Sequence, residues 1–317
     1  MRILFAAVFS LFCFAVHAWP TKPVRIVVAY PPGGGIDVMA RQLADKLTPV
    51  WGQPVLVENK PGANTILAAD AVAKSPADGH TILLTTDATF SINPHLYAKL
   101  PYDAQRDFIP VTMLVLLQQL LVAHPAVPFN DVKGLIEAAK AKPGSINYAS
   151  YGSGSQPHLS GEMLKNKAGI DLVHVPYKGI SLAVPAVMAG EVQLTFAGIA
   201  TSMPQLKAGR IKALAIGGTA RSPLLPQVPT FAELGYPEVE THAWFGLFLP
   251  ANSPREAVGR IHRDTRAVLE EPDFRQKQLI DKGYEVVGSS PDDFVIYLQK
   301  DSASRARAVK ISGAKAE

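Results

Sequence analysis

The segment VRIVVAYPPGGGIDVMARQLADKL (Val24–Leu47) decides the fold class. A run rich in β-branched residues ends at two prolines and three glycines, and apolar residues then return at helical spacing. Strand, glycine turn and helix in this order open a parallel β-α-β unit. Such a turn either binds an anion at the helix start or only makes a tight turn, and the segment alone leaves both possibilities open.

The same alternation continues along the chain and predicts two α/β lobes. Elements are expected at residues 54–59, 65–74, 81–86, 132–142, 146–150, 158–168 and 182–189. No low-complexity linker separates the two halves, so we expect strands that cross from one lobe to the other. From Phe274 to the end, the polar pattern predicts helix on an outer wall.

Residues 1–18 have the features of a secretory signal peptide. Arg2 is followed by an apolar stretch too short to span a bilayer, and Val16-His17-Ala18 resembles a cleavage signal. We therefore expect the mature chain to begin at Trp19. Cys13 is the only cysteine and lies within this segment, so the mature chain has no disulfide and no thiolate metal site.

The charge of the chain is mild. It is +4 overall and, without Arg2, +3 for residues 19–317. Lysines and arginines are scattered without runs, so neither a nucleic acid nor an anionic membrane surface is indicated. A slightly positive surface suits a small anionic ligand.

Two glycine loops each precede a predicted helix. PPGGGID fits neither the dinucleotide-binding nor the Walker pattern, but its free amides favour an anion at the helix start. Asp37 is interpreted there as a helix cap or a first-turn acid. YASYGSGSQPHLSGEML repeats the arrangement in the second lobe, where Ser150, Ser153 and Ser155 add hydroxyl donors. Facing each other across a cleft, the two loops fit a ligand with a carboxylate at one or both ends.

Two further strand ends are polar. TTDATFS (Thr85–Ser91) follows a strand of the first lobe, and HVPYKGIS (His174–Ser181) follows one of the second. Lys178 either pairs with a ligand carboxylate or is a solvated surface lysine. Tyr177 either contacts the ligand or packs at the edge of the lobe.

Catalytic patterns are weak. The serines read GSGS rather than GxSxG, and no positioned acid follows the pair Ser155 and His158. The histidines show no HxxxH or HExxH spacing, so we expect no metal ion, and no cofactor motif is present.

The ordered motifs YPPGGGID, GQPVLVENKPGAN, YGSGSQPHL, HVPYKG, KALA, PQVPTFAELG and AWFGLFLP resemble the tripartite tricarboxylate transporter receptors, the Bug or TctC family. The resemblance covers nearly all of the mature chain. It implies a periplasmic solute-binding protein of the type II-like, two-lobed α/β architecture, each lobe a mixed, mostly parallel sheet flanked by helices. The lobes would close on a carboxylate in the cleft between them and deliver it to a membrane transporter.

The resemblance also implies the site and the lobe boundaries. A crossover near 111–123 and a return near 243–250 give lobe 1 as residues 19–122 and 247–317, and lobe 2 as residues 123–246. The first glycine loop, partly through ordered water, and the second-lobe serine loop would hold the ligand. The ligand contacts that the resemblance implies are Gly34, Gly35, Ile36, Asp37, Thr86 with its neighbour Asp87, Ser150, Ser153, Gly154, Ser155 and Tyr177. The predicted site also includes Lys178 and Ala197.

One departure from the family pattern bears on the ligand. After VQLTF the family often has an acidic residue, whereas this chain has Ala197 and Gly198. An amino-acid ligand is therefore disfavoured, and space is left for something bulkier.

We thus expect a monomeric periplasmic receptor for a small carboxylate, working with membrane subunits of a tripartite tricarboxylate transporter. The ligand would be an aliphatic di- or tricarboxylate or an aromatic acid such as a phthalate isomer. Two alternatives remain at this point: a secreted serine hydrolase, and a carboxylate sensor that signals to a membrane kinase.

Overall fold

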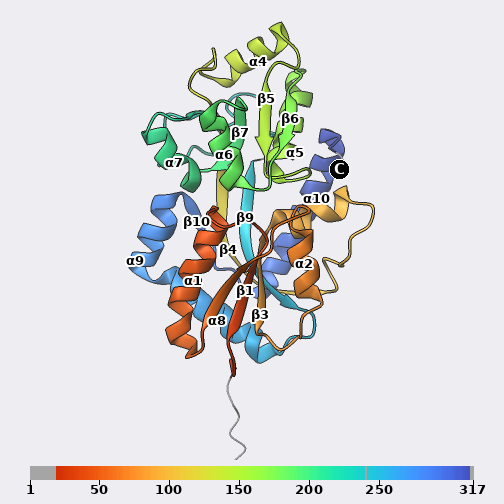
Figure 1. The fold of residues 1–317 in the computed structure, drawn as a ribbon, viewed down its shortest axis with the longest axis vertical. Coiled ribbons are helices and arrows are strands. Elements are labelled where there is room, and N and C mark those ends of the chain that lie inside the picture. Colours follow the sequence, from red (N-terminus) through yellow and green to blue (C-terminus); the bar gives the residue numbers. More distant parts are fainter. Residues whose placement is uncertain (1–18, 240, 315–317) are drawn as a thin grey trace, which may run out of the picture.

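The computed structural model describes residues 19–239 and 241–314. The predicted signal peptide and Cys13 lie outside the described residues. The chain forms two α/β lobes stacked along its long axis (Figure 1), as predicted. In the part of the chain that is described, no helix is both long and apolar enough to cross a membrane.

The first lobe begins with strands and helices in alternation. They are β1 (Val24–Val28), α1 (Gly35–Trp51), β2 (Val55–Asn59), α2 (Ile66–Ala73) and β3 (Thr81–Thr86), followed by the π-helical turn η1 (Ala88–Ile92) and α3 (Asn93–Leu96). β1 pairs in parallel with both β2 and β3. Because parallel strands point the same way, the loops after β1 and β3 emerge at one edge of the sheet, where the second lobe begins.

Two long strands connect the lobes. β4 (Phe108–Ala123) pairs antiparallel with β9 (His242–Pro250) up to Gln118, and from Gln119 onward it pairs with β7 (Leu194–Gly198) and β8 (Lys212–Ile216). β9 also pairs with β3 of the first lobe. β4 therefore belongs to the sheets of both lobes, and Figure 1 shows it at the waist of the molecule. The lobe boundaries at 122/123 and 246/247 stay predictions.

The second lobe repeats the alternation around β7 and β8. Its other elements are α4 (Val132–Ala141), β5 (Asn147–Ser150), α5 (Gln156–Ala168), β6 (Val173–Pro176), α6 (Ile180–Ala189) and α7 (Ile199–Lys207). β5 pairs in parallel with β6 and β7.

The sheets are mixed, as predicted, but parallel pairing does not predominate. Parallel neighbours occur only within β-α-β units, whereas every antiparallel pairing between named strands involves β4 or β9. The strands that join the lobes return beside strands that already run the other way, and this makes their pairing antiparallel.

The C-terminal segment is not helical throughout, so that prediction was wrong in part. α8 (Arg255–Glu270), α9 (Pro272–Phe274) and the turns η2 (Arg275–Leu279) and η3 (Ile280–Lys282) lead into a short strand, β10 (Tyr284–Val286), which pairs with β4. α10 (Pro291–Ser312) follows, and the Ser290 side chain caps it by accepting from the amide of Asp293 at 3.1 Å.

α10 is also more than an outer wall. It packs against α5 and η1, and the Arg305 side chain is only 1% exposed. The Asp301 carboxylate accepts a hydrogen bond from Trp244 Nε1 of β9 at 2.9 Å and lies 3.5 Å from Arg305 Nε. A buried charge network therefore connects the last helix to a crossing strand.

Apolar clusters fill both faces of the first-lobe sheet. Ile26 and Val28 pack on the side of α1, with Leu43 of that helix, whereas Val27 faces the opposite side with Val72 of α2. This alternation follows from the two-residue period of a strand. Burial of each such side chain contributes about 1.5–3 kcal/mol. The loops at the edge of this sheet are therefore held on a rigid base.

Candidate functional site

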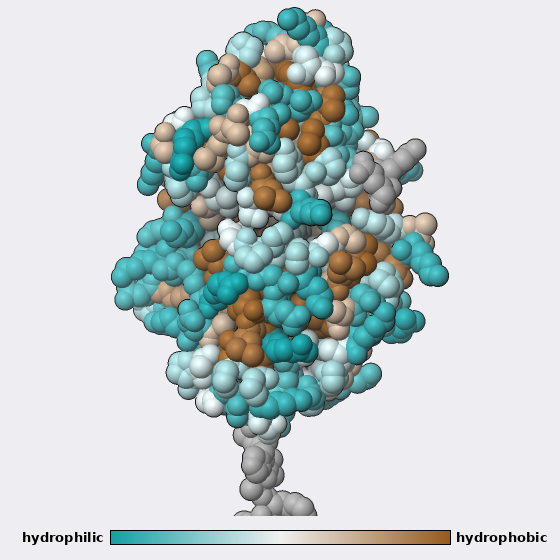
Figure 2. Space-filling model, in the orientation of Figure 1, coloured by the Kyte–Doolittle hydropathy of each residue, from teal (hydrophilic) through white to brown (hydrophobic). Residues whose placement is uncertain are grey.

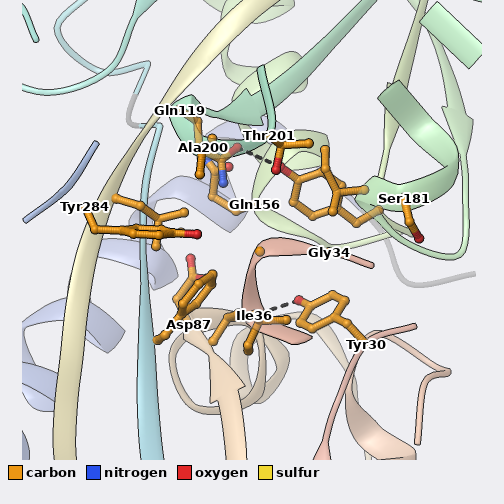
Figure 3. Close-up of a pocket in the computed structure, with 18 of the residues that line it drawn as sticks. Tyr30, Gly34, Ile36, Asp87, Gln119, Gln156, Ser181, Ala200, Thr201 and Tyr284 are labelled. Atoms are coloured by element: carbon orange, nitrogen blue, oxygen red, sulfur yellow. Dashed lines mark hydrogen bonds between the residues drawn. The ribbon is translucent and has the colours of Figure 1, made fainter. Parts of the chain in front are cut away.

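A pocket lies between the two lobes, at the edge where the glycine loops emerge (Figure 3). It contains about 700 Å³ of space not filled by protein atoms, part of which is open to solvent. It is lined by Tyr30, Pro31, Gly34, Gly35, Ile36, Thr86, Asp87, Leu117, Gln119, Tyr151, Gln156, Ile180, Ser181, Gly198, Ala200, Thr201, Ala243, Phe245 and Tyr284. None of these lining residues is a lysine, arginine or histidine.

The starts of four helices converge on this pocket. The lining includes Gly34 to Ile36 at α1, Gln156 at α5, Ile180 and Ser181 at α6, and Gly198, Ala200 and Thr201 at α7. The first amides of a helix have no partner within the helix, and the helix start carries partial positive charge. The arrangement can therefore bind an anion without a cationic side chain.

The first glycine loop is shaped by its backbone and by Asp37. Gly33 has a φ of 87°, which favours glycine, and Gly34 is extended. The Asp37 carboxylate turns back onto the loop, where it accepts hydrogen bonds from the Gly33 amide at 3.0 Å, from Asn59 Nδ2 at 2.8 Å and from Arg41. Asp37 therefore fixes the loop and is not among the lining residues.

These contacts also set the acidity of Asp37. Burial acts to raise the pKa of this carboxyl, but the hydrogen bonds from Arg41, Gly33 and Asn59 outweigh burial and lower it. Asp37 is thus a carboxylate at neutral pH, with its charge used within its own lobe.

Asp87 is the one carboxyl group among the lining residues. It follows β3 directly and is 1% exposed, and Arg305 Nη2 of α10 lies 3.3 Å from its Oδ2. Burial raises the pKa of Asp87 to about 6. Arg305 and His242 act to lower this pKa, whereas repulsion from Asp301 adds to the rise. The floor of the pocket therefore has a group that can change its charge near neutral pH.

Three tyrosines also line the pocket. The Tyr30 hydroxyl lies 3.1 Å from Thr86 Oγ1, and the Tyr151 hydroxyl donates to the Phe196 carbonyl at 2.9 Å and to Gln119 Oε1 at 3.2 Å. Figure 3 shows the Tyr30 and Gln119 interactions as dashed lines and the hydroxyl of Tyr284 pointing into the space between the lobes.

The serine loop of the second lobe mostly bonds to itself. Ser150 Oγ donates to the Gly152 carbonyl at 3.0 Å and lies 2.7 Å from His174 Nε2, and Ser155 Oγ donates to the same carbonyl at 2.7 Å. None of Ser150, Ser153 and Ser155 is among the lining residues. The residues of this segment that line the pocket are instead Tyr151 and Gln156.

The other predicted contacts of the second lobe also stand just outside the lining. Gly154 packs against Leu96 of the first lobe, Tyr177 lies 3.5 Å from Glu191, Lys178 is exposed and Ala197 is fully buried in the lobe. Their chain neighbours Ile180, Ser181 and Gly198 line the pocket in their place.

Of the predicted residues, the structure brings Gly34, Gly35, Ile36, Thr86 and Asp87 together in the lining. Contact of any predicted residue with a ligand stays a prediction.

Sequence reasoning missed two groups of lining residues. The first group lies within the quoted motifs or directly after the strand VQLTF, so that position in these loops was a usable signal: Tyr30, Pro31, Tyr151, Gln156, Ile180, Ser181, Gly198, Ala200 and Thr201. The second group comes from the crossing strands and β10: Leu117, Gln119, Ala243, Phe245 and Tyr284. No local pattern marks this second group, because only the long-range pairing of the strands brings it to the cleft.

The geometry does not support a serine nucleophile. The Ser155 hydroxyl is directed to the Gly152 carbonyl, and His158 Nδ1 accepts from the Gly154 amide at 2.9 Å. The His158 ring stacks on His174 with centroids 3.8 Å apart. Among the described residues, no group of three or more histidine, cysteine, aspartate or glutamate side chains is placed to hold a metal ion.

Comparison with known families is decisive. The model of the TctC family, described as the tripartite tricarboxylate transporter family receptor, matches residues 39–313. The chain belongs to this family. It is therefore a solute-binding receptor of a tripartite tricarboxylate transporter and not an enzyme, and its family implies membrane transporter subunits as partners.

Three solved structures of similar proteins confirm the periplasmic binding protein fold. R. palustris Rpa4515 with adipate is 34% identical, with a TM-score of 0.90, over 94% of this chain and 99% of that one. The periplasmic binding protein BugD is 31% identical, with a TM-score of 0.88, over 94% and 99%. MatC from Rhodopseudomonas palustris with bound malate is 30% identical, with a TM-score of 0.87, over 92% and 100%.

Proposed function

We propose that this receptor captures an aliphatic dicarboxylate of the size of malate or adipate in the periplasm and delivers it to the membrane subunits of its transporter. The observation that carries the proposal is the convergence of four helix starts on a pocket without a basic lining side chain. Amides and hydroxyls bind a carboxylate through oriented donors, and partial helix charges supply the attraction.

The walls of the pocket support this ligand class. Pro31, Ile36, Leu117 and Phe245 give it apolar walls that fit a methylene chain. Two similar receptors were solved with adipate and with malate.

The proposal gives each predicted contact a place. The amides of Gly34, Gly35 and Ile36 bind one carboxylate of the ligand, and Thr86 and Asp87 form the floor beneath it. Ser150 and Ser155 fix the loop that presents Gln156, and Ser153 and Gly154 are part of that loop. No direct ligand contact is assigned to Tyr177, Lys178 and Ala197. They position their chain neighbours Ile180, Ser181 and Gly198, which face the cleft. The receptor works as a monomer after removal of residues 1–18, with lobe 1 as residues 19–122 and 247–317.

The test is a binding panel on residues 19–317. Malate, succinate, adipate, citrate and phthalate are compared by thermal shift and isothermal titration, with adipamide as the uncharged control for adipate. A true ligand at a hundred times its Kd stabilises the fold by about 2.7 kcal/mol. For a chain of this size that is a rise in melting temperature on the order of several degrees.

The proposal predicts that a dicarboxylate binds, that adipamide does not, and that mass spectrometry recovers the ligand unchanged. A panel in which only citrate or phthalate binds would overturn the choice of ligand class. A panel in which no carboxylate binds, or in which the ligand is turned over, would overturn the receptor function itself.

A further inference from the structure

Tyr284 lies on one wall of the pocket without a known role. It is the first residue of the short strand β10, and it lines both the pocket and a neighbouring crevice that includes Gln42, Gln205 and Lys282. In Figure 3 its hydroxyl points into the space between the lobes. Its ring therefore separates two spaces, and its polar end faces the pocket.

The fold holds Tyr284 in this position from two sides. Its backbone pairs with Leu117 of β4, and its ring packs against Phe245 of β9 with centroids 5.9 Å apart. The preceding residue, Gly283, lies so close to Ile199 of α7 that a Cβ on it would come within 2.7 Å of that side chain. The start of β10 is therefore held between the two lobes.

The Tyr284 hydroxyl differs from those of the other two tyrosines in the lining. Tyr30 and Tyr151 have hydrogen-bond partners, whereas the Tyr284 hydroxyl has none among the residues that the structure describes. Burial raises the pKa of Tyr284 well above its usual value, so the group is a neutral donor. Because this hydroxyl faces the pocket and has no protein partner in the described part of the chain, it is available to donate to an incoming acceptor.

The same hydroxyl lies beside the first helix start. A Cβ on Gly35 would come within 2.7 Å of Tyr284 Oη, so only a glycine leaves room for both groups. The amides of Gly35 and Ile36 open α1 at this point. A carboxylate bound to those amides comes within reach of the tyrosine hydroxyl.

We propose that Tyr284 is a ligand-positioning residue, whose hydroxyl donates a hydrogen bond to the carboxylate bound at the start of α1. The inference rests on the proposed function and adds a donor from the C-terminal segment to the donors of the two glycine loops. It fixes where one end of the ligand lies, against Gly35 and not at Asp87.

The test compares Tyr284→Phe with wild type, using adipate, or malate if the wild type binds malate more tightly. Loss of one hydrogen bond to a charged group should weaken binding by roughly ten- to a hundredfold in isothermal titration. The melting temperature without ligand should stay about the same, because the variant keeps the ring packed against Phe245 and breaks no hydrogen bond to the described protein residues. Tyr236→Phe in the second lobe, away from the pocket lining, is the matched control and should bind as wild type does.

Each other outcome has a definite meaning. If the wild type binds the ligand and the Kd of Tyr284→Phe lies within about twofold of the wild-type Kd, the role of the hydroxyl is overturned while the proposed function stands. Weaker binding together with a lower melting temperature without ligand would show a structural role and also overturn the inference. Absence of carboxylate binding by the wild type would overturn the proposed function, and the inference with it.

Discussion

Gly34 touches the other lobe at the edge of the pocket, and enlarging it should prevent the lobes from closing. A Cβ at Gly34 would lie 3.2 Å from Ile180 Cγ2 on α6, which is closer than side chains normally pack. The backbone of Gly34 is extended, with φ −79° and ψ 163°, a conformation that valine adopts without strain. Gly34→Val should therefore fold and disturb mainly the contact between the lobes.

The size of the effect follows from the packing. Inserting side-chain atoms into a filled contact costs typically about 1–3 kcal/mol. If ligand binds the closed form, that cost falls on the bound state, and the Kd rises by roughly five- to 150-fold. Gly34→Ala adds a single methyl group at 3.2 Å, which a small shift of Ile180 relieves, so its effect should be much smaller.

Isothermal titration measures the Kd of both variants, and small-angle scattering measures the radius of gyration with and without ligand. Gly259→Val on α8 is the matched control, because a Cβ there meets no atom within 4 Å. The account predicts weaker binding and less compaction for Gly34→Val alone. Wild-type affinity in Gly34→Val, with full compaction on adding ligand, would refute the reasoning.

Three other predictions concern the charges beneath the pocket. As the pH rises from 6 to 8, the affinity of the wild type for a carboxylate should fall by up to about tenfold per pH unit, because Asp87, with a pKa of about 6, becomes charged beneath an anionic ligand. In isothermal titration, Asp87→Asn should show a flatter dependence of affinity on pH. Parallel profiles for the variant and the wild type would contradict this role of Asp87. Between pH 4 and 6 the native state holds the Asp87 proton that the unfolded chain has lost, so the stability of the unliganded wild type should decline in that window relative to Asp87→Asn in thermal unfolding. Arg305→Met leaves Asp87 and Asp301 buried without this counter-charge and should destabilise the fold at pH 7.5 by about 3–5 kcal/mol in chemical denaturation, whereas a change below about 1 kcal/mol would show that the network is not stabilising.

The alternating β-α-β units were predictable because each is local. The glycine turn before α1 and the serine loop before α5 each indicate a strand, a turn and a helix within a short stretch of chain. The pairing of β4 with four other strands was not predictable, since it depends on residues far apart in sequence. The polar pattern after Phe274 predicts helix over Tyr284–Val286 as well, because a three-residue strand has too few residues to show a two-residue period.

The candidate site was predictable to the level of loops and not of atoms. Gly34 and Gly35 face the cleft as expected, because a helix start must present its free amides somewhere. The sequence did not show that Asp37 would turn back to its own loop, or that Ser150 and Ser155 would bond to the carbonyl of Gly152. A short polar side chain in a loop satisfies a neighbouring backbone group as readily as a ligand, and residue type does not distinguish the two.

The central claim is that helix amides, not a cationic side chain, hold the ligand carboxylate between the lobes. A crystal structure of residues 19–317 with the best dicarboxylate of the panel tests it most directly. The account predicts a carboxylate at hydrogen-bond distance from the amide of Gly35 or Ile36, directly or through one ordered water molecule, with α6 and α7 closed over the ligand. A ligand bound elsewhere, or one whose carboxylate is paired with a lysine or arginine, would contradict it.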